Sequence, residues 1–261
     1  MNNNIEEIII FGDVHLEQQT LIDPSYILFK KVVSSLKPDR IICLGDLMDC
    51  SYISRFSEGI AGEQEGKRLK ADFEIFKNEM QWLKKHSKQK PIFLEGNHEI
   101  RLNKYLDKNP ILKGLFCLED YAKEVDVEYI PLENQPYQLY NDLYITHGIC
   151  FGTHFCKTMV NKVGNSIIAG HTHRTQLHSI SYPDGRVITG YGIGTLGPVN
   201  PDYTAGLRVT EHTHSFGQLL VDRNTDYKQF NIIDIKDNKC IINKKLFENT
   251  KIDESLSLIQ E

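Results

Sequence analysis

Short, largely apolar runs recur along the chain and predict buried strands. They occupy residues 5–11, 41–44, 91–95, 143–146 and 166–169. The first run ends in four consecutive apolar residues, which is typical of a strand covered on both faces. The runs therefore predict a sheet that is enclosed between other layers of the fold.

Between these runs, apolar residues recur at intervals of three and four positions, as they do on the buried face of a helix. This periodicity predicts helices over residues 25–36, about 64–85 and 154–163. A further helical stretch, residues 102–123, should be interrupted at Asn109-Pro110, because proline removes a backbone donor from a helix. Helices that alternate with strands predict an α/β fold.

After residue 173 the pattern changes to short alternating segments. Residues 176–182 and 186–191 flank a Pro-Asp-Gly turn and predict a β-hairpin. Further strands are predicted over residues 127–132, 137–139, 215–221, 227–235 and 239–247, and loops over residues 51–66 and 190–201. No linker divides the chain, so we expect one domain over residues 1–248 and a polar tail over residues 249–261.

Composition and charge exclude several classes of protein. The chain has 261 residues, a formal net charge of −5 and a pI near 6.1, and it lacks the basic excess of proteins that grip long nucleic acids. Its N-terminus resembles no signal peptide, and no apolar run approaches the ~18 residues of a membrane span. The six cysteines form no Cys-x-x-Cys pair. We expect a cytoplasmic protein with reduced thiols and no membrane partner, and the sequence leaves its oligomeric state open.

The five apolar runs share one ending, a sharp break followed by Asp, Asn or His. Carboxyl ends of strands are where α/β sheets collect ligands, so these side chains should meet in one cleft. Each ending alone has an ordinary structural explanation, such as a turn or a helix cap, but five together predict a metal site. The endings are Asp13-Val14-His15, Gly45-Asp46-Leu47-Met48-Asp49, Gly96-Asn97-His98-Glu99, His147-Gly148 and Gly170-His171-Thr172-His173.

In this order the motifs resemble those of the calcineurin-like metallophosphoesterase family, and the resemblance extends over residues 13–173. It implies a two-sheet α/β sandwich flanked by helices, with a dinuclear metal site at the C-terminal ends of the strands. It also implies the ligands, with Asp46 bridging: Asp13, His15, Asp46 and His173 for one metal, and Asp46, Asn97, His147 and His171 for the other.

The implied chemistry is phosphoester hydrolysis by a hydroxide that two metals activate. The resemblance makes His98 the general acid and Asp49 the carboxylate that orients its ring. Arg101 could reach a phosphate oxygen with its planar guanidinium, although an exposed helix arginine is an equal interpretation. The mixed imidazole and carboxylate ligands favour Mn, with Fe, Zn, Co or Ni as alternatives, over Mg or Ca.

Departures from the family pattern narrow the range of possible substrates. Cys50-Ser51 and Glu95 stand where the serine/threonine protein phosphatases carry arginine-containing motifs, and those enzymes lack Gly-His-x-His. This favours a phosphodiesterase-like or small-phosphoester hydrolase, with a small phosphoester or a nucleotide as substrate, over a protein phosphatase. The stretch over residues 96–106 resembles phage and bacterial members. Three alternatives remain: a nuclease on short or single-stranded ends, a phosphomonoesterase, and a non-catalytic metal-containing binding module. A nuclease would need a basic strip, such as Lys67, Arg68 and Lys70, or Lys157 and Lys162.

Four further histidines are interpreted only in part. His212-Thr213-His214 repeats the spacing of the last motif but follows no apolar run, so we expect a surface loop. His154 and His178 lie close in sequence to the predicted ligands, either lining the cleft or packing beside it.

Overall fold

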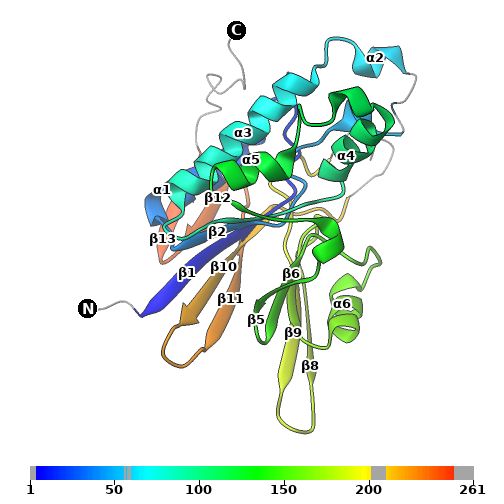
Figure 1. Cartoon of the computed structure of the whole chain (residues 1–261). Helices are drawn as coiled ribbons and strands as arrows, with labels where there is room; N and C mark the ends of the chain where they lie inside the picture. Colours follow the sequence, from blue (N-terminus) through cyan, green and yellow to red (C-terminus); the bar gives the residue numbers. More distant parts are fainter. Residues whose placement is uncertain (1–3, 56, 58–59, 201–209, 250–261) are drawn as a thin grey trace.

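Two β-sheets face each other and are flanked by helices (Figure 1). The computed structural model describes residues 4–55, 57, 60–200 and 210–249. The first sheet has the order β11-β10-β1-β2-β3-β4, with β1 to β4 parallel, and the second has the order β5-β6-β7-β9-β8. The predicted α/β sandwich is confirmed.

The strands of the first sheet are β1 (Ile5–Phe11), β2 (Arg40–Cys43), β3 (Ile92–Leu94), β4 (Glu128–Ile130), β10 (Ser215–Asp222) and β11 (Lys228–Asp234). Those of the second are β5 (Tyr137–Tyr140), β6 (Leu143–Thr146), β7 (Ser166–Ala169), β8 (Gln176–Ser181) and β9 (Val187–Gly192). The helices are α1 (Pro24–Leu36), α2 (Ala61–Gln64), α3 (Leu69–His86), α4 (Glu99–Lys108), α5 (Leu118–Glu124) and α6 (Phe155–Val163), with 3-10 turns η1 (Ser51–Ile53), η2 (Pro110–Leu112) and η3 (Leu132–Asn134).

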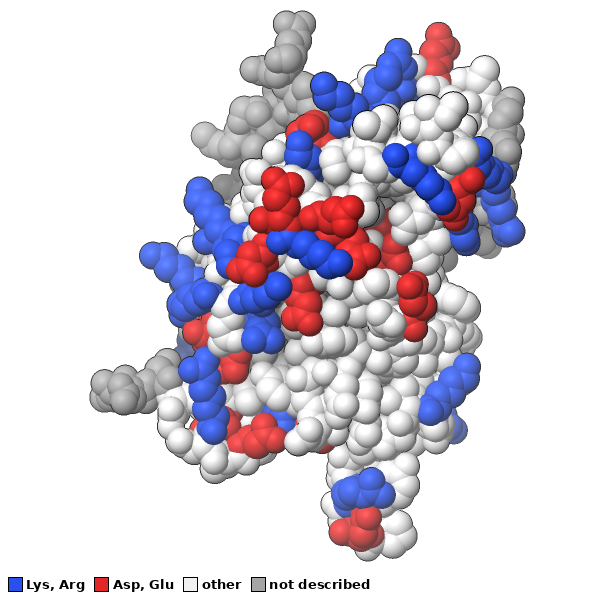
Figure 2. Space-filling model, in the orientation of Figure 1, with Lys and Arg blue, Asp and Glu red and all other residues white. Residues whose placement is uncertain are grey.

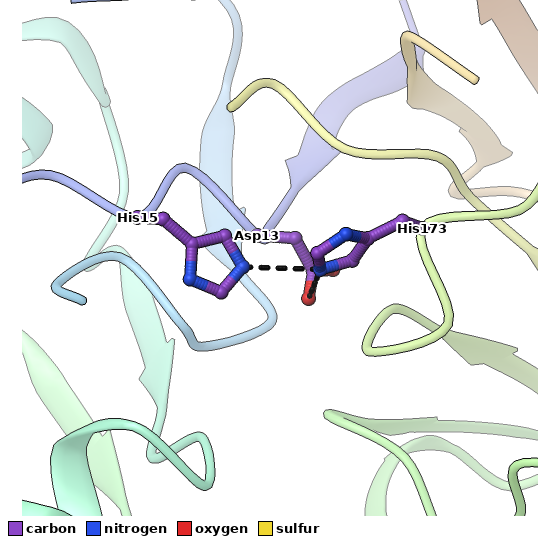
Figure 3. Close-up of side chains that lie close together, drawn as sticks. All are labelled: Asp13, His15 and His173. Carbon is purple, nitrogen blue, oxygen red and sulfur yellow. Dashed lines mark hydrogen bonds and ion pairs between the residues drawn. The ribbon is translucent and has the colours of Figure 1, made fainter. Parts of the chain in front are cut away.

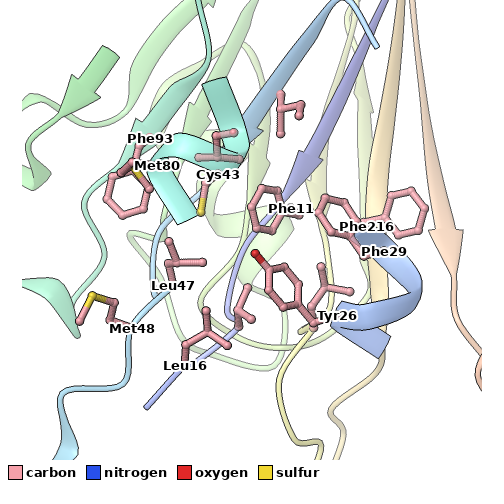
Figure 4. Close-up of a cluster of buried hydrophobic side chains, with 14 of the residues drawn as sticks. Phe11, Leu16, Tyr26, Phe29, Cys43, Leu47, Met48, Met80, Phe93 and Phe216 are labelled. Atoms are coloured by element: carbon pink, nitrogen blue, oxygen red, sulfur yellow. The ribbon is translucent and has the colours of Figure 1, made fainter. Parts of the chain in front are cut away.

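The continuous apolar run of β1 serves two cores at once, because successive side chains of a strand point to opposite faces. Ile8 and Ile10 pack between the two sheets, in a cluster that includes Ile168. Ile9 and Phe11 point the other way and pack under the helices. Figure 4 shows this second cluster, where Phe29 of α1 packs against the rings of Phe11 and of Phe216 from β10.

The outer face of the second sheet is covered by α6. Phe155, Cys156 and Met159 are fully buried against Ile167 and Ala169 of β7. Both sheets of the sandwich are thus held in place by packing, at roughly 1.5–3 kcal/mol for each large apolar side chain removed from water. Among the described residues, no helix is long and apolar enough to cross a membrane.

One predicted helix begins later than expected. The apolar periodicity predicts a helix over about residues 64–85. In the structure α3 begins at Leu69, and Gln64 belongs to the short helix α2. Arg68 is extended, with φ −139° and ψ 123°, because the Gln18 side chain accepts a hydrogen bond from its backbone nitrogen and donates one to its oxygen. A contact from a distant part of the chain overrides the local periodicity here.

The prediction of one continuous strand near the end of the chain is also wrong. Residues 239–247 form a hairpin of β12 (Lys239–Ile242) and β13 (Lys245–Glu248) instead of one strand. Asn243 and Lys244 have φ of 51° and 63°, the left-handed conformation that a two-residue hairpin turn requires. Of the tail predicted over residues 249–261, residues 250–261 lie outside the described part of the chain.

Candidate metal centre

All seven predicted ligands come together where strands of the two sheets end. Asp13 and His15 follow β1, Asp46 follows β2, and Asn97 follows β3. His147 follows β6, while His171 and His173 follow β7 of the other sheet. The backbone nitrogen of His171 donates to both carboxylate oxygens of Asp13, at 3.0 and 2.8 Å, and so ties the two sheets together at this point.

One group of donor atoms is formed by Asp13, His15 and His173 (Figure 3). The Nε2 atoms of His15 and His173 are 3.0 Å apart, and Nε2 of His173 lies 3.3 Å from Oδ1 of Asp13. The three donor atoms converge on one point from loops that are 158 residues apart in the sequence. Such a cluster of nitrogen and oxygen donors can hold a divalent metal.

A second group is formed by Asp46, His147 and His171, with Asn97 beside it. Nε2 of His147 lies 2.9 Å from Oδ1 of Asn97, 3.0 Å from Nδ1 of His171 and 3.3 Å from Oδ2 of Asp46. The other ring nitrogen of His147, Nδ1, lies 2.9 Å from the backbone oxygen of Leu44 and donates its proton there. In the neutral ring, that bond fixes the tautomer and leaves Nε2 unprotonated and able to bind a metal.

The backbone is strained at five of the seven predicted ligands. Asp13, His15, Asp46, His171 and His173 have φ between 48° and 67°, which side chains other than glycine rarely adopt. Strain of this kind costs on the order of 1–3 kcal/mol per residue and persists only where the surrounding fold imposes it. Here the fold uses it to turn each side chain into the cleft immediately after its strand ends.

The buried charges of the two groups are strongly coupled. Burial opposes the ionisation of Asp46, but His147 and His98 outweigh it and hold the pKa of Asp46 well below its usual range. Burial likewise opposes a charge on His147, yet Asp46 raises the pKa of His147 to about 9. Burial and the adjacent His147 lower the pKa of His171 to about 4.

These opposed shifts fit a site built for cations. Two imidazoles only 3.0 Å apart cannot both be protonated, and both face carboxylates that remain ionised. Divalent metals bind unprotonated imidazoles and ionised carboxylates, so they would satisfy all these groups together. Four imidazoles, two carboxylates and an amide are a donor set that suits transition metals.

His98 lies at the edge of this centre and is held by Asp49. Its Nδ1 is 2.8 Å from both the backbone oxygen and Oδ1 of Asp49, and its backbone nitrogen donates to Asp46. Burial works against a charge on His98, but Asp46 and Asp49 raise its pKa. Arg101 donates from Nη1 to the backbone oxygen of Asp49, and its Nη2 lies 2.9 Å from Nε2 of His98.

Glu99 is a buried carboxylate that the sequence prediction missed. It accepts backbone hydrogen bonds from Asp46 at 2.9 Å, Met48 at 3.0 Å and Gly96 at 2.9 Å, and thereby joins the loops after β2 and β3. Burial, followed by the charge of Asp46, raises the pKa of Glu99 to about 7. Its place directly after His98 in the sequence was the available signal, but nothing there indicated a role in positioning the loops.

His212 and Thr213 lie in a loop, as predicted, and Thr213 is exposed. The loop nevertheless reaches the candidate centre, because the half-buried His212 ring packs edge-on against His173 with 4.7 Å between ring centroids. Thr213 donates from its backbone nitrogen to the oxygen of His173. His154, exposed at the start of α6, and His178, half-buried in β8, are outside the groups of donor atoms in the described part of the chain.

Comparison with known proteins agrees with this geometry. The sequence model of the family described as calcineurin-like phosphoesterase matches residues 7–175, about two thirds of the chain. The chain belongs to the calcineurin-like phosphoesterase family. Membership makes it a metal-dependent phosphoesterase, and the groups of His and Asp described above could hold the metal.

Relatives of this phosphoesterase occur in phages. It is 26% identical to the gene 54 protein of Mycobacterium phage L5 over 178 residues, covering 63% of this chain and 69% of the relative. It is 26% identical to the gene 54 protein of Mycobacterium phage D29 over 207 residues, covering 74% and 80%. This agrees with the predicted resemblance to phage members.

Two solved structures are distantly similar. Vps29 from Entamoeba histolytica aligns with a TM-score of 0.39 at 11% identity, covering 92% of this chain and 95% of that one. A dimetal phosphatase from Danio rerio aligns with a TM-score of 0.37 at 10% identity, covering 86% and 98%. Likeness at this level carries no conclusion about substrate.

Proposed function

We propose that this phosphoesterase hydrolyses a phosphodiester, in a small phosphoester or a nucleotide, at a dinuclear centre. Asp13, His15, Asp46 and His173 would hold one cation, and Asp46, Asn97, His147 and His171 the other. Two bound divalent cations, with Mn as our first candidate, would polarise the attacking water and neutralise the phosphoryl oxygens. The observation that carries the proposal is the convergence of these side chains beside a histidine that a carboxylate orients.

His98 is proposed to donate a proton to the leaving oxygen. Because an arginine always donates, Arg101 makes Nε2 of His98 an acceptor and places the ring proton on Nδ1, toward Asp49. General acid catalysis needs the proton on Nε2, so the guanidinium must turn to another acceptor first. A phosphate oxygen of the substrate is the acceptor we propose, since it pairs well with the planar guanidinium.

The first experiment compares hydrolysis of bis-p-nitrophenyl phosphate with that of p-nitrophenyl phosphate, with Mn²⁺ and with EDTA. Cleavage of the diester that EDTA abolishes is the expected result. Cleavage of the monoester alone would replace the proposal by a phosphomonoesterase. Two bound metals with no cleavage of either ester would contradict it and favour a non-catalytic binding module.

Replacing His98 by alanine separates its role from metal binding. We expect His98→Ala to retain both metals but to lose roughly 10²–10⁴-fold in kcat, the usual contribution of general acid catalysis. His154→Ala is the matched control, because His154 is exposed and outside the groups of donor atoms. Turnover and metal content are measured on the same samples, and a near-native kcat for His98→Ala would rule out this role.

A nuclease remains a second candidate, but the two basic strips suggested by the sequence support it poorly. Nζ of Lys67 lies 3.2 Å from Oε2 of Glu17 and donates to the backbone oxygen of Gln18, so its charge is already paired. Lys157 and Lys162 are on α6, over the outer face of the second sheet. On the face in Figure 2, basic and acidic side chains are interspersed over α3 and α5 and form no continuous basic surface.

A further inference from the structure

A pocket of about 540 Å³ opens directly beside the candidate metal centre. Its described wall is formed by α4, by Ile53, Ser54 and Arg55 at the end of η1, and by Gln64 of α2, and Asn97 and Arg101 also lie on it. A volume of this size is typical of sites for small molecules and cofactors. The pocket therefore adjoins the site and has room for a whole group beyond the scissile phosphate.

One face of α4 lines this pocket with basic and aromatic side chains. Arg101, Lys104, Tyr105 and Lys108 all line it, and they follow one another at the three- and four-residue spacing of a single helix face. Leu102 and Leu106 are buried on the opposite side and fix the rotation of the helix. From Arg101 to Lys108 the stripe extends ~10 Å along the axis, at 1.5 Å per residue.

Basic side chains predominate on the described wall of the pocket. Four of the described residues that line it are Lys or Arg, with Arg55 joining the three on α4, and none of the described lining residues is Asp or Glu. Arg101 is already paired, since its Nη1 lies 3.7 Å from Oδ1 of Asp49. Lys104 is exposed, and no ion pair of its side chain is found among the described residues. Figure 2 shows basic side chains, with some acidic ones between them, at the upper right of the molecule where Figure 1 places α2 and α4.

The position of the pocket relative to His98 assigns it to one side of the reaction. Arg101 stands between the two, with its Nη2 2.9 Å from Nε2 of His98 and its side chain on the pocket wall. His98 is proposed to protonate the leaving oxygen, so the part of the substrate that departs should lie on this side. Lys104, which is exposed and has no ion pair among the described residues, would favour a negatively charged leaving group on this side.

We propose that this pocket binds the leaving group of the substrate, and that the leaving group is a nucleotide unit with at least one phosphate besides the scissile one. Lys104 and its neighbours on α4 would pair with the additional phosphate, and Tyr105 would offer a face on which the base can stack. This rests on the proposed phosphodiesterase function. In the reaction, water adds to phosphorus and the bond from phosphorus to the leaving oxygen breaks. That oxygen takes the proton of His98, and the water releases a proton to solvent.

The test compares dithymidine monophosphate with the same dinucleotide that carries a terminal phosphate at either its 5′ or its 3′ end. We expect at least one of the two phosphorylated forms to be cleaved with a kcat/KM about tenfold higher or more. Lys104→Gln should bring that ratio close to one, whereas Lys157→Gln, an exposed lysine on α6, should preserve it. An equal kcat/KM for all three substrates in the wild type would overturn the proposal, and so would an unchanged ratio in Lys104→Gln.

A binding experiment separates this proposal from the proposed function. Thymidine 3′,5′-bisphosphate is titrated calorimetrically in EDTA, so that no turnover occurs. We expect Lys104→Gln to raise its Kd about tenfold and Tyr105→Leu to raise it several-fold, while Tyr105→Leu leaves the Kd of inorganic pyrophosphate unchanged. Absence of binding to the wild type would overturn the pocket assignment. Binding without any hydrolysis of bis-p-nitrophenyl phosphate in Mn²⁺ would instead overturn the phosphodiesterase function.

Discussion

At the scale of single residues, the site depends on side chains that never need to touch a metal. Glu99 is fully buried and uses both carboxylate oxygens to hold the backbones of Asp46, Met48 and Gly96. A buried carboxylate with three such donors fixes where the loop after β2 stands relative to the loop after β3. Partners of this kind hold metal ligands in position, so their loss weakens metal binding.

We therefore expect Glu99→Gln to weaken metal binding although it removes no predicted ligand. The amide group that replaces one oxygen would face a backbone N–H, so at least one buried donor is left unsatisfied. The expected losses are roughly 10–100-fold in metal affinity and about 1–3 kcal/mol in the free energy of unfolding. Calorimetric titration with Mn²⁺ and urea unfolding measure the two quantities. Asp107→Asn, an exposed position on the same helix, is the control and should change neither.

Asp72 links the stability of the fold to pH. It is 2% exposed, and its Oδ1 accepts two hydrogen bonds from Gln18. Burial raises the pKa of Asp72 to about 6 from 3.8. Between these two pH values Asp72 is ionised in the unfolded chain but protonated in the folded protein. The folded state therefore loses stability as pH rises from about 4 to about 6.

Asp72→Asn should remove this loss. Relative to the wild type, the variant should gain roughly 2–3 kcal/mol in the free energy of unfolding between about pH 4 and pH 7. Urea unfolding at a series of pH values measures the difference. Asp126→Asn serves as the control, because Asp126 is exposed and its pKa is lowered by Lys84 rather than raised. A constant difference between Asp72→Asn and the wild type across this range would contradict the expected pH dependence.

At the scale of elements, the turns that follow the strands leave little space. A Cβ added at Gly148, just after β6, would lie 2.6 Å from Cβ of His171, which is closer than real Cβ atoms approach. A Cβ at Gly152, four residues further along, would meet nothing within 4 Å. The tight packing of the first position brings the loop of β6 against the loop of β7, and so keeps His147 beside His171.

Gly148→Ala should thus displace His171 while leaving the sandwich folded. We expect at least about a tenfold loss of affinity at the proposed site of Asn97, His147 and His171, as is typical when the support of a ligand is disturbed. Gly152→Ala should bind metal as the wild type does. Calorimetric titration with metal measures the affinity of both variants. An affinity of Gly148→Ala equal to that of the wild type would show that the loop can shift without moving the His171 ring.

At the scale of the whole molecule, the candidate centre joins the two sheets. Asp13 and Asp46 come from the first sheet, whereas His147, His171 and His173 come from the second. Each proposed metal would therefore be held from both sheets. Because such a site does not exist in the unfolded chain, metal binding should stabilise the fold.

Addition of Mn²⁺ at 100 times its Kd should raise the free energy of unfolding by about 2.7 kcal/mol for each occupied site, and EDTA should reverse the gain. Thermal and urea unfolding of the same sample, with and without metal, measure this. His147→Ala should lose part of the gain and His154→Ala none of it. A wild type that unfolds identically in Mn²⁺ and in EDTA would contradict metal binding across the two sheets.

The sequence by itself determined the central strands and the set of residues that meets at their ends, because each of these strands is an apolar run and each predicted ligand lies within a few residues of its end. The order of the motifs resembled one family, and that resemblance implied the two-sheet fold. The roles of these residues stay predictions, as does the single domain over residues 1–248.

Only the tertiary structure decided which distant groups support the site. Three contacts depend on segments that are remote in sequence: the backbones of Asp46 and Met48 on Glu99, the ring of His212 against His173, and the wall that η1 adds to the pocket along α4. The late start of α3 has the same origin, since Gln18 holds Arg68 in an extended conformation. Local periodicity and spacing determine where elements form, but the contacts between elements depend on how the sheets and helices pack.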